Sequence, residues 1–200
     1  MLKNDYLRYA FILTVICLVA AGLLSVVHRV TQPKIDAQRL AEEQGSLKDV
    51  FPDAAAFEPV REAEEILYYN ALDRQKRVVG YAFKAVRRGY SSDIVTMAGM
   101  TPDGRIVRIK ILSQNETPGL GARIAEVIQK ETFWDVVLRR VKVLSQPRPW
   151  FQERFDGKDA ATLSETVDAI TGATISSSAV IASVQERAAE ILQRAKNGRQ

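Results

Sequence analysis

One long apolar segment lies near the start of the chain. Residues 9–27 form nineteen consecutive positions without a charged side chain, and only Thr14, Cys17 and Ser25 among them are polar or weakly polar. Folded as a helix, this segment would be about 28 Å long, close to the ~30 Å thickness of a bilayer's hydrocarbon core. The pattern predicts a transmembrane helix. A cleaved signal peptide is the alternative, although its apolar region is usually about 7 to 15 residues long.

The next segment is predicted to contain a second helix. Pro33 should interrupt the first helix, because proline lacks the N–H that the helical ladder needs and restricts the residue before it. An amphipathic helix is then expected over residues 34–50, and a loop over residues 54–65 leads into a folded core. The chain is therefore expected to divide into three parts, which are a membrane anchor over 1–30, a helical linker region over 31–65 and a folded domain over 66–200.

Alternation of apolar and polar positions between residues 66 and 113 is typical of antiparallel strands. A type I turn is expected at residues 101–104, where proline and glycine occupy the positions that this turn favours. In the strand after this turn, Val107, Ile109 and Ile111 are expected to face one way, and Arg108 and Lys110 the other. The pattern predicts an antiparallel meander with one buried face.

Helices are expected around this sheet. Short helices are predicted over residues 121–127 and 131–138, and Trp134 of the second would pack on the sheet. The final helix, over residues 174–195, has an apolar face made of Val180, Ile181, Val184, Ala188, Ile191 and Leu192. The predicted fold class is α+β, with one N-terminal transmembrane helix followed by an antiparallel-sheet domain with flanking helices.

Composition and charge exclude several functional classes. The chain has 28 Lys plus Arg and 24 Asp plus Glu, and the net charge of +4 is spread along the sequence, so no nucleic-acid partner is expected. A single Cys allows no internal disulfide and no thiolate-rich metal site. A single His, His28, allows no histidine-based zinc site. We therefore expect no metal site and no catalytic residue in this chain.

A cluster of small residues directly precedes the final helix. The segment over 167–178 reads VDAITGATISSS and contains one glycine. Glycine lets a backbone approach a ligand closely, and the free N–H groups of a helix's first turn favour an anion. A phosphate fits such a position, with the hydroxyl of Thr174 beside it and Ser176 and Ser177 able to add hydrogen bonds. The alternative is a structural role, in which Thr171 or Thr174 caps the helix and the glycine forms a turn.

A second glycine-containing segment, residues 115–121, lies between a predicted strand and a predicted helix. Gly119 and Gly121 flank Leu120, so they expose backbone polar groups that could hold a flat heterocycle while the leucine packs against its face. An ordinary Pro-Gly turn is the alternative. Neither segment alone identifies a function.

Together the two segments carry a resemblance to a known family. ETPGLG at 116–121 and DAITGATISS at 168–177, after one membrane span, resemble RnfG, the FMN-binding subunit of Rnf electron transport complexes. The chain is also similar to NqrC, the corresponding subunit of the sodium-translocating NADH:quinone oxidoreductase. The resemblance covers nearly the whole chain in order and spacing.

The resemblance implies a covalently bound FMN. In this family the last threonine of the S/T-G-A-T pattern carries FMN through a phosphoester bond, and the matching residue is Thr174. An ApbE-type flavin transferase installs the group from FAD with Mg²⁺ and recognises the residues that match Asp168, Thr171, Gly172 and Ala173. The family's other flavin-contacting loop is matched by Glu116, Thr117, Gly119, Leu120 and Gly121.

Two positions depart from the family pattern. Ser91-Ser92-Asp93 stands where many relatives have Gly-Gly-Pro, and Gln114 stands where relatives often carry a histidine. The first difference means that the flavin contacts of residues 91–93 do not follow from the family pattern. The two differences together could change the hydrogen bonds to the flavin and its reduction potential.

The resemblance also implies a role and a location. It implies an electron-carrying subunit that works with other membrane and iron-sulfur subunits of a complex coupling ferredoxin and NAD chemistry to Na⁺ or H⁺ movement, without independent substrate turnover. The alternatives are an NqrC-type subunit and a non-redox, membrane-anchored binding or scaffold module. In the family the C-terminal domain lies on the extracytoplasmic (periplasmic) face of the cytoplasmic (inner) membrane. Basic residues flank the apolar segment on both sides, so charge alone does not choose this orientation.

Overall fold

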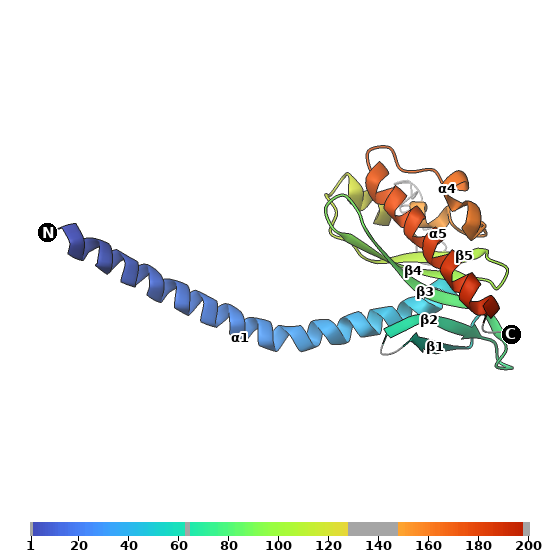
Figure 1. Cartoon of the computed structure of the whole chain (residues 1–200), viewed down its shortest axis with the longest axis horizontal. Coiled ribbons are helices and arrows are strands. Elements are labelled where there is room, and N and C mark those ends of the chain that lie inside the picture. The colour runs from blue at the N-terminus through green and yellow to red at the C-terminus, as the bar shows by residue number, and fades with distance from the viewer. Residues whose placement is uncertain (1, 63–64, 128–147, 198–200) are drawn as a thin grey trace, which may run out of the picture. The chain divides into compact units, whose positions relative to one another are not determined.

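The computed structural model describes residues 2–62, 65–127 and 148–197. The chain divides into two compact units, residues 1–42 and 43–200. The second unit contains a five-stranded antiparallel sheet with helices packed on it (Figure 1). This arrangement confirms the predicted α+β class.

Helix α1 runs without a break from Leu2 to Val50. The expected interruption at Pro33 is therefore wrong, because this proline lies inside the helix. A proline removes one helical hydrogen bond and costs roughly 3 kcal/mol in a helix interior. The ten residues that follow Pro33 are mostly strong helix formers such as Ala, Leu, Glu, Gln and Arg, so the helix continues beyond it. Its end at Val50 agrees with the prediction.

One helix in the described part of the chain is long and apolar enough to span a membrane. From Tyr6 onward, α1 contains an 18-residue window with a mean hydropathy of 2.8, and none of this window is buried. Large apolar side chains such as Phe11, Leu18 and Leu24 are exposed along it. Apolar surface of this extent is accommodated by lipid and not by water.

Strands β1 to β5 form an antiparallel meander. Each strand pairs with its neighbours in the sequence, so the order in the sheet is β1-β2-β3-β4-β5 (Figure 1). The bounds of the five strands are Ala56–Glu62, Glu65–Leu72, Val78–Arg88, Asp93–Met100 and Ile106–Ser113. The meander confirms the predicted strand arrangement, whereas the single buried face is wrong, because apolar layers pack on both faces of the sheet.

Strand β1 occupies residues that were expected to form a loop. The loop over 54–65 is wrong, because Ala56–Glu62 pairs antiparallel with β2. Pro59 lies within this strand, and a proline weakens the sequence signal of a strand. The strand is nevertheless possible because β1 lies at the edge of the sheet, where proline is tolerated. A register shift between Val60 and Arg61 further disturbs its alternation.

A bulge in β5 changes which side chain enters the core. The register of the β4–β5 pair shifts between Gly99 and Met100, and Val107 is the extra residue on β5. A bulge reverses the faces of the residues beyond it, so Ile106 is fully buried and Val107 only half-buried. The expectation that Val107 shares the buried face of Ile109 is therefore wrong, whereas Ile111 packs partly buried against the same core as Ile109, as predicted.

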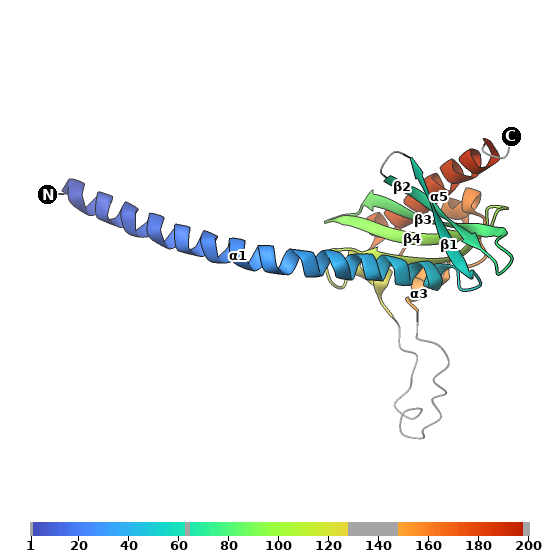
Figure 2. The ribbon, with the colours of Figure 1, turned by 90° about the horizontal axis from the view of Figure 1, so that it is seen from below.

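The sheet is covered by a helix on each face. Helix α5, Thr174–Asn197, lies across β3 and β4 (Figure 1). Its buried residues Val180, Val184 and Ile191 belong to the same apolar core as alternate β3 residues, namely Tyr81, Phe83 and Ala85. On the opposite face, Leu47 and Val50 of the last turns of α1 pack with Ala82 and Met97 (Figure 2). Successive side chains of β3 therefore point into two separate apolar layers, one on each face of the sheet.

Short helical segments complete the second unit. A 3₁₀ helix, η1, covers Gly121–Ala125 and confirms a helical segment in the predicted range 121–127. The remaining short elements are α3, η2 and α4, which cover Trp150–Glu153, Ala160–Thr162 and Leu163–Thr166. The helix predicted over 131–138, with Trp134, lies outside the described residues.

Candidate functional site

Three segments meet at one end of the second unit. The loop between β3 and β4 supplies Tyr90, and the segment after β5 supplies Thr117, Leu120 and Gly121. The rest of the lining comes from the turn before α5 and from the first residues of that helix. These segments enclose an open cavity of about 270 Å³ lined by Tyr90, Thr117, Leu120, Gly121, Gly172, Ala173, Thr174, Ile175 and Ser176. The fold therefore brings together the two glycine-containing segments that the sequence singled out.

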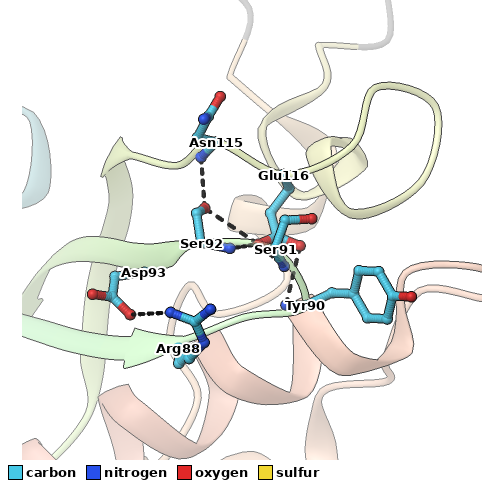
Figure 3. Close-up of polar contacts among 7 residues, drawn as sticks. All are labelled: Arg88, Tyr90, Ser91, Ser92, Asp93, Asn115 and Glu116. Carbon is cyan, nitrogen blue, oxygen red and sulfur yellow. Dashed lines mark hydrogen bonds and ion pairs between the residues drawn. The ribbon is translucent and has the colours of Figure 1, made fainter.

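A buried carboxylate holds the three segments in place. Glu116 is only 4% exposed. Its Oε1 accepts hydrogen bonds from the backbone N–H groups of Ser91 at 3.0 Å and Ser92 at 2.9 Å, and its Oε2 accepts from the N–H of Tyr90 at 3.2 Å (Figure 3). The hydroxyl of Ser176 donates to Oε2 at 2.6 Å. One side chain thus joins the β3–β4 loop, the segment after β5 and the start of α5.

The environment of Glu116 keeps the carboxylate charged. Burial by itself raises the pKa of a carboxyl group, because the ionised form loses its hydration. The hydrogen bonds from Ser176 and from the N–H groups of Ser92, Ser91 and Tyr90 outweigh this effect and leave the pKa of Glu116 below its ordinary value. Glu116 is therefore an ionised, fixed acceptor at neutral pH.

Gly121 is required by the position of this carboxylate. A Cβ atom added at Gly121 would collide with Oε2 of Glu116 and would lie 2.6 Å from Oγ of Ser176. Only glycine lets the backbone pass this close to the pair. The second glycine of the 116–121 segment is thus explained by packing against Glu116, on the inner side of the cavity wall.

Helix α5 begins at the cavity with Thr174. The carbonyl of Ala173 accepts the first helical hydrogen bond, from the N–H of Ser177 at 2.9 Å. The N–H groups of Thr174, Ile175 and Ser176 precede that bond, so they have no partner within the helix. Thr174 is exposed, and its hydroxyl makes only a long contact of 3.5 Å with the carbonyl of Ile170. Free N–H groups and the dipole of a 24-residue helix favour an anion beside this hydroxyl.

Ser177 fixes the turn that precedes the helix. Its Oγ donates to the carbonyl of Ala173 at 2.8 Å and accepts from the N–H of Ile170 at 3.0 Å. The turn between them needs Gly172, whose φ of +83° lies in the left-handed region that favours glycine. A Cβ at Gly172 would have only Nη1 of Arg123 nearby, at 4.0 Å, so the space beside the turn is open.

Two arginines donate hydrogen bonds to carbonyl groups at and before the same turn. Nη1 of Arg123, from η1, donates to the carbonyl of Thr171 at 3.0 Å. Nη1 of Arg154 donates to the carbonyl of Asp168 at 3.2 Å, and its guanidinium lies 4.8 Å from the centre of the Trp150 ring. The carboxylate of Asp168 itself remains exposed.

The mouth of the cavity is apolar. Tyr90, Leu120 and Ile175 all line it, and they are 69%, 52% and 56% exposed. The ring of Tyr90 is directed away from Glu116, although its backbone N–H binds that carboxylate (Figure 3). Large apolar side chains left open around a cavity are typical of a ligand site.

The residues predicted from the sequence fall into two groups. Seven line the cavity, namely Thr117, Leu120, Gly121, Gly172, Ala173, Thr174 and Ser176. The same two segments also contain Glu116, Gly119, Asp168, Thr171 and Ser177, which do not line the cavity. The hydroxyls of Ser176 and Ser177 bind Glu116 and the turn before α5, so they support the site from within. Thr174 presents the exposed hydroxyl.

Three residues of the site were missed in the sequence, and the first is Tyr90, which lines the cavity from the β3–β4 loop. Ile175 lines the cavity, and its place directly after Thr174 in a helix's first turn could have indicated this. Arg123 reaches the turn before α5 from the other segment. In the sequence, Arg123 is visible only as a basic residue two positions after Gly121. Its contact with Thr171 depends on the fold and could not be predicted.

Comparison with known proteins agrees with this geometry. Residues 89–189 match the FMN-binding domain family, and residues 1–50 match the RnfG N-terminal region. The first match contains all the segments that form the cavity, and the second covers α1. The chain therefore binds FMN and is anchored in a membrane through its apolar N-terminal helix.

Curated relatives match most of the chain. The G subunit of an ion-translocating oxidoreductase complex from Methanosarcina acetivorans is 32% identical, over 84% of this chain and 85% of the relative. The G subunit of a proton-translocating ferredoxin:NAD(+) oxidoreductase complex from Clostridium ljungdahlii is 26% identical, over 90% and 88%. The G subunit of a Na(+)-translocating ferredoxin:NAD(+) oxidoreductase complex from Acetobacterium woodii is 29% identical, over 88% and 87%. The protein belongs to the FMN-binding domain family, and within it to the G subunits of ion-translocating oxidoreductase complexes.

Proposed function

We propose that this protein is the electron-carrying G subunit of an Rnf-type ferredoxin:NAD oxidoreductase complex, with FMN bound covalently to Thr174. The observation that carries the proposal is the exposed Thr174 hydroxyl at the start of α5, inside a cavity within the family match. The names of the relatives support the complex, because all three are G subunits of ion-translocating oxidoreductases.

The residues present fit an FMN group in two parts. A planar ring system needs apolar walls, and Tyr90, Leu120 and Ile175 offer them at the mouth of the cavity. A phosphate needs N–H donors, and the first turn of α5 offers them beside Thr174. The open space beside Gly172 leaves room for the group to approach.

The attachment would be made by an ApbE-type flavin transferase acting on FAD. Oγ1 of Thr174 gains the bond to phosphorus, AMP is the leaving group, and the hydroxyl proton is released. The transferase would recognise the exposed Asp168 together with Thr171, Gly172 and Ala173. The phosphodiester that results keeps one negative charge, which the N–H groups at the start of α5 stabilise.

When bound, FMN supplies the redox chemistry that the side chains of this protein lack. The protein's own part is to hold the group. Glu116 and Ser176 fix the inner wall of the cavity, Ser177 fixes the turn before α5, and the apolar residues at the mouth exclude water from the ring. The electrons would pass to and from the other membrane and iron-sulfur subunits of the complex.

The test is the mass of the peptide that contains Thr174. The full chain is coexpressed with an ApbE-type transferase and digested, and the peptide should gain the mass of one FMN less one water. Thr174→Val should remove the gain, whereas Ser178→Ala, an exposed residue of the same helix, should keep it. An unmodified peptide in the parent protein, or flavin retained by denatured Thr174→Val protein, contradicts the proposal. A scaffold function would give the first of these results.

Membrane orientation is a separate proposal. We propose that residues 43–200 lie on the extracytoplasmic side and that the N-terminus lies in the cytoplasm. Protease added to cells with a permeabilised outer envelope should cleave the second unit while a cytoplasmic marker protein stays intact. Protection of the second unit until the inner membrane is lysed contradicts this orientation. Copurification with Rnf subunits, and not with subunits of a quinone reductase, would exclude the NqrC-type alternative.

A further inference from the structure

The guanidinium of Arg123 lies beside the turn that leads into Thr174. Its Nη1 is 3.0 Å from the carbonyl oxygen of Thr171 and 4.0 Å from the place where a Cβ of Gly172 would lie. Thr174 is only two residues beyond Gly172 along a tight turn. The positive charge is therefore held beside the turn that ends at Thr174, next to the open space at Gly172.

Arg123 is not committed to another strong partner in the described structure. Its Nε lies 3.7 Å from Oε2 of Glu126, beyond hydrogen-bonding distance, and the side chains are 39% and 52% exposed. An exposed ion pair of this kind contributes little, because water screens both charges. A guanidinium has five N–H donors, and the Thr171 carbonyl uses one of them. Donors and charge thus remain for an anion.

We propose that Arg123 binds the phosphate of the flavin carried by Thr174. This inference rests on the proposed attachment at Thr174. The N–H groups at the start of α5 would donate hydrogen bonds to the phosphodiester. The guanidinium of Arg123, from η1, would bind it from the other side. The segment after β5 would then hold both ends of the group, since Leu120 lines the cavity and Arg123 follows three residues later.

The experiment uses the full chain in a phosphorus-free detergent, coexpressed with the transferase. For each variant, the melting temperature of the flavin-bearing protein is compared with that of the same variant carrying Thr174→Val. Arg123→Gln should lose roughly half of the gain in melting temperature that the parent shows on flavin attachment. Arg105→Gln, an exposed arginine paired with Asp103, should keep the whole gain. Glu126→Gln should keep or increase the gain in melting temperature, because this substitution removes the ion pair between Glu126 and Arg123.

The ³¹P resonance of the attached group gives an independent readout. In the parent it should differ between the folded and the denatured protein, and in Arg123→Gln most of this difference should disappear. A merely structural role of Arg123 at Thr171 would lower the melting temperature with and without flavin alike and leave the ³¹P shift unchanged, which would overturn the proposal. Absence of the flavin mass on Thr174 of the parent would instead overturn the attachment itself.

A second variant covers failure of attachment in Arg123→Gln. If folded Arg123→Gln protein is not modified but Arg123→Lys is, the charge beside Thr174 is needed and the proposal is supported. If both variants fold and neither is modified, a positive charge at this position does not support attachment, and the proposal is wrong.

Discussion

The hydroxyl of Ser176 donates a 2.6 Å hydrogen bond to Oε2 of Glu116, and both side chains are buried. This contact joins the two glycine-containing segments, which are 60 residues apart in the sequence. Gly121 packs directly against the pair. The inner wall of the cavity is therefore built around a single ionised carboxylate.

Replacing Glu116 by Gln should destabilise the protein. The amide would present N–H groups to the donors of Tyr90 and Ser176, so the free energy of unfolding at pH 7 should fall by about 3 kcal/mol. Urea unfolding of the full chain in detergent, followed by tryptophan fluorescence, measures this change. A loss below the error of the method would mean that the carboxylate does not support the site.

The same variant should alter the pH dependence of stability. The pKa of Glu116 is lower in the folded chain than its ordinary value of 4.5, so ionisation of this group favours folding. That contribution is complete above the ordinary pKa and is lost as the pH falls below it through the folded value. Between about pH 5 and pH 3 the parent should therefore lose more stability than Glu116→Gln does. Parallel curves for the two proteins would show that another carboxyl is responsible.

Two glycine substitutions should differ in their effects. Gly121→Ala places a methyl group against Glu116 and Ser176, and we expect a loss of about 2 to 3 kcal/mol together with weaker flavin binding. Gly119→Ala meets no atom within 4 Å and costs only about 1 kcal/mol, from its φ of +76°. Melting temperatures and the fraction of protein that carries flavin check the order. Equal effects would contradict the close approach at Gly121.

Ser177 and Ser178 form a matched pair. Ser177→Ala removes the acceptor of the Ile170 N–H and a donor to Ala173, so it should cost about 2 kcal/mol. Ser178 is exposed, and Ser178→Ala should change the stability by less than about 0.5 kcal/mol. Thermal unfolding of the two variants is the measurement. The turn before α5 does not depend on the Ser177 hydroxyl if the two variants melt alike.

The end of α1 should contribute to the core of the second unit. Leu47 is 5% exposed and packs on the sheet with Val50, so Leu47→Ala should cost about 2 to 4 kcal/mol. Leu40→Ala is the control, because Leu40 is exposed earlier in the same helix. Urea midpoints of both variants provide the comparison. A full effect from Leu40→Ala, or none from Leu47→Ala, contradicts the observed packing.

The fold was predictable where periodicity is regular. Alternation in β3 and the apolar face of α5 identified the sheet and its covering helix from the sequence alone. Periodicity failed at β1 and at Val107, where an edge proline and a bulge break the period of two. The prediction also failed at Pro33, since a single local breaker does not outweigh the favourable helix residues that follow it.

The site was predictable only as two motifs. Small residues before a helix indicated an anion site at Thr174, and the glycines at 119 and 121 indicated exposed backbone groups that could hold a flat ring. The partners of Glu116 could not be predicted, because three of its donors are backbone N–H groups of the β3–β4 loop. Backbone donors leave no signal in side-chain identity. The position of Arg123 similarly depends on how η1 meets the turn before α5.

The dependence of the cavity on α5 also determines when the cavity forms during synthesis of the chain. A chain is made from its N-terminus, so α1 and the five strands exist before Ser176 does. Until α5 has been synthesised and has packed on the sheet, Glu116 lacks its hydroxyl partner and the cavity lacks one wall. The anchor is therefore among the first parts of this protein to be made, and the cofactor site is among the last to be completed during its biogenesis.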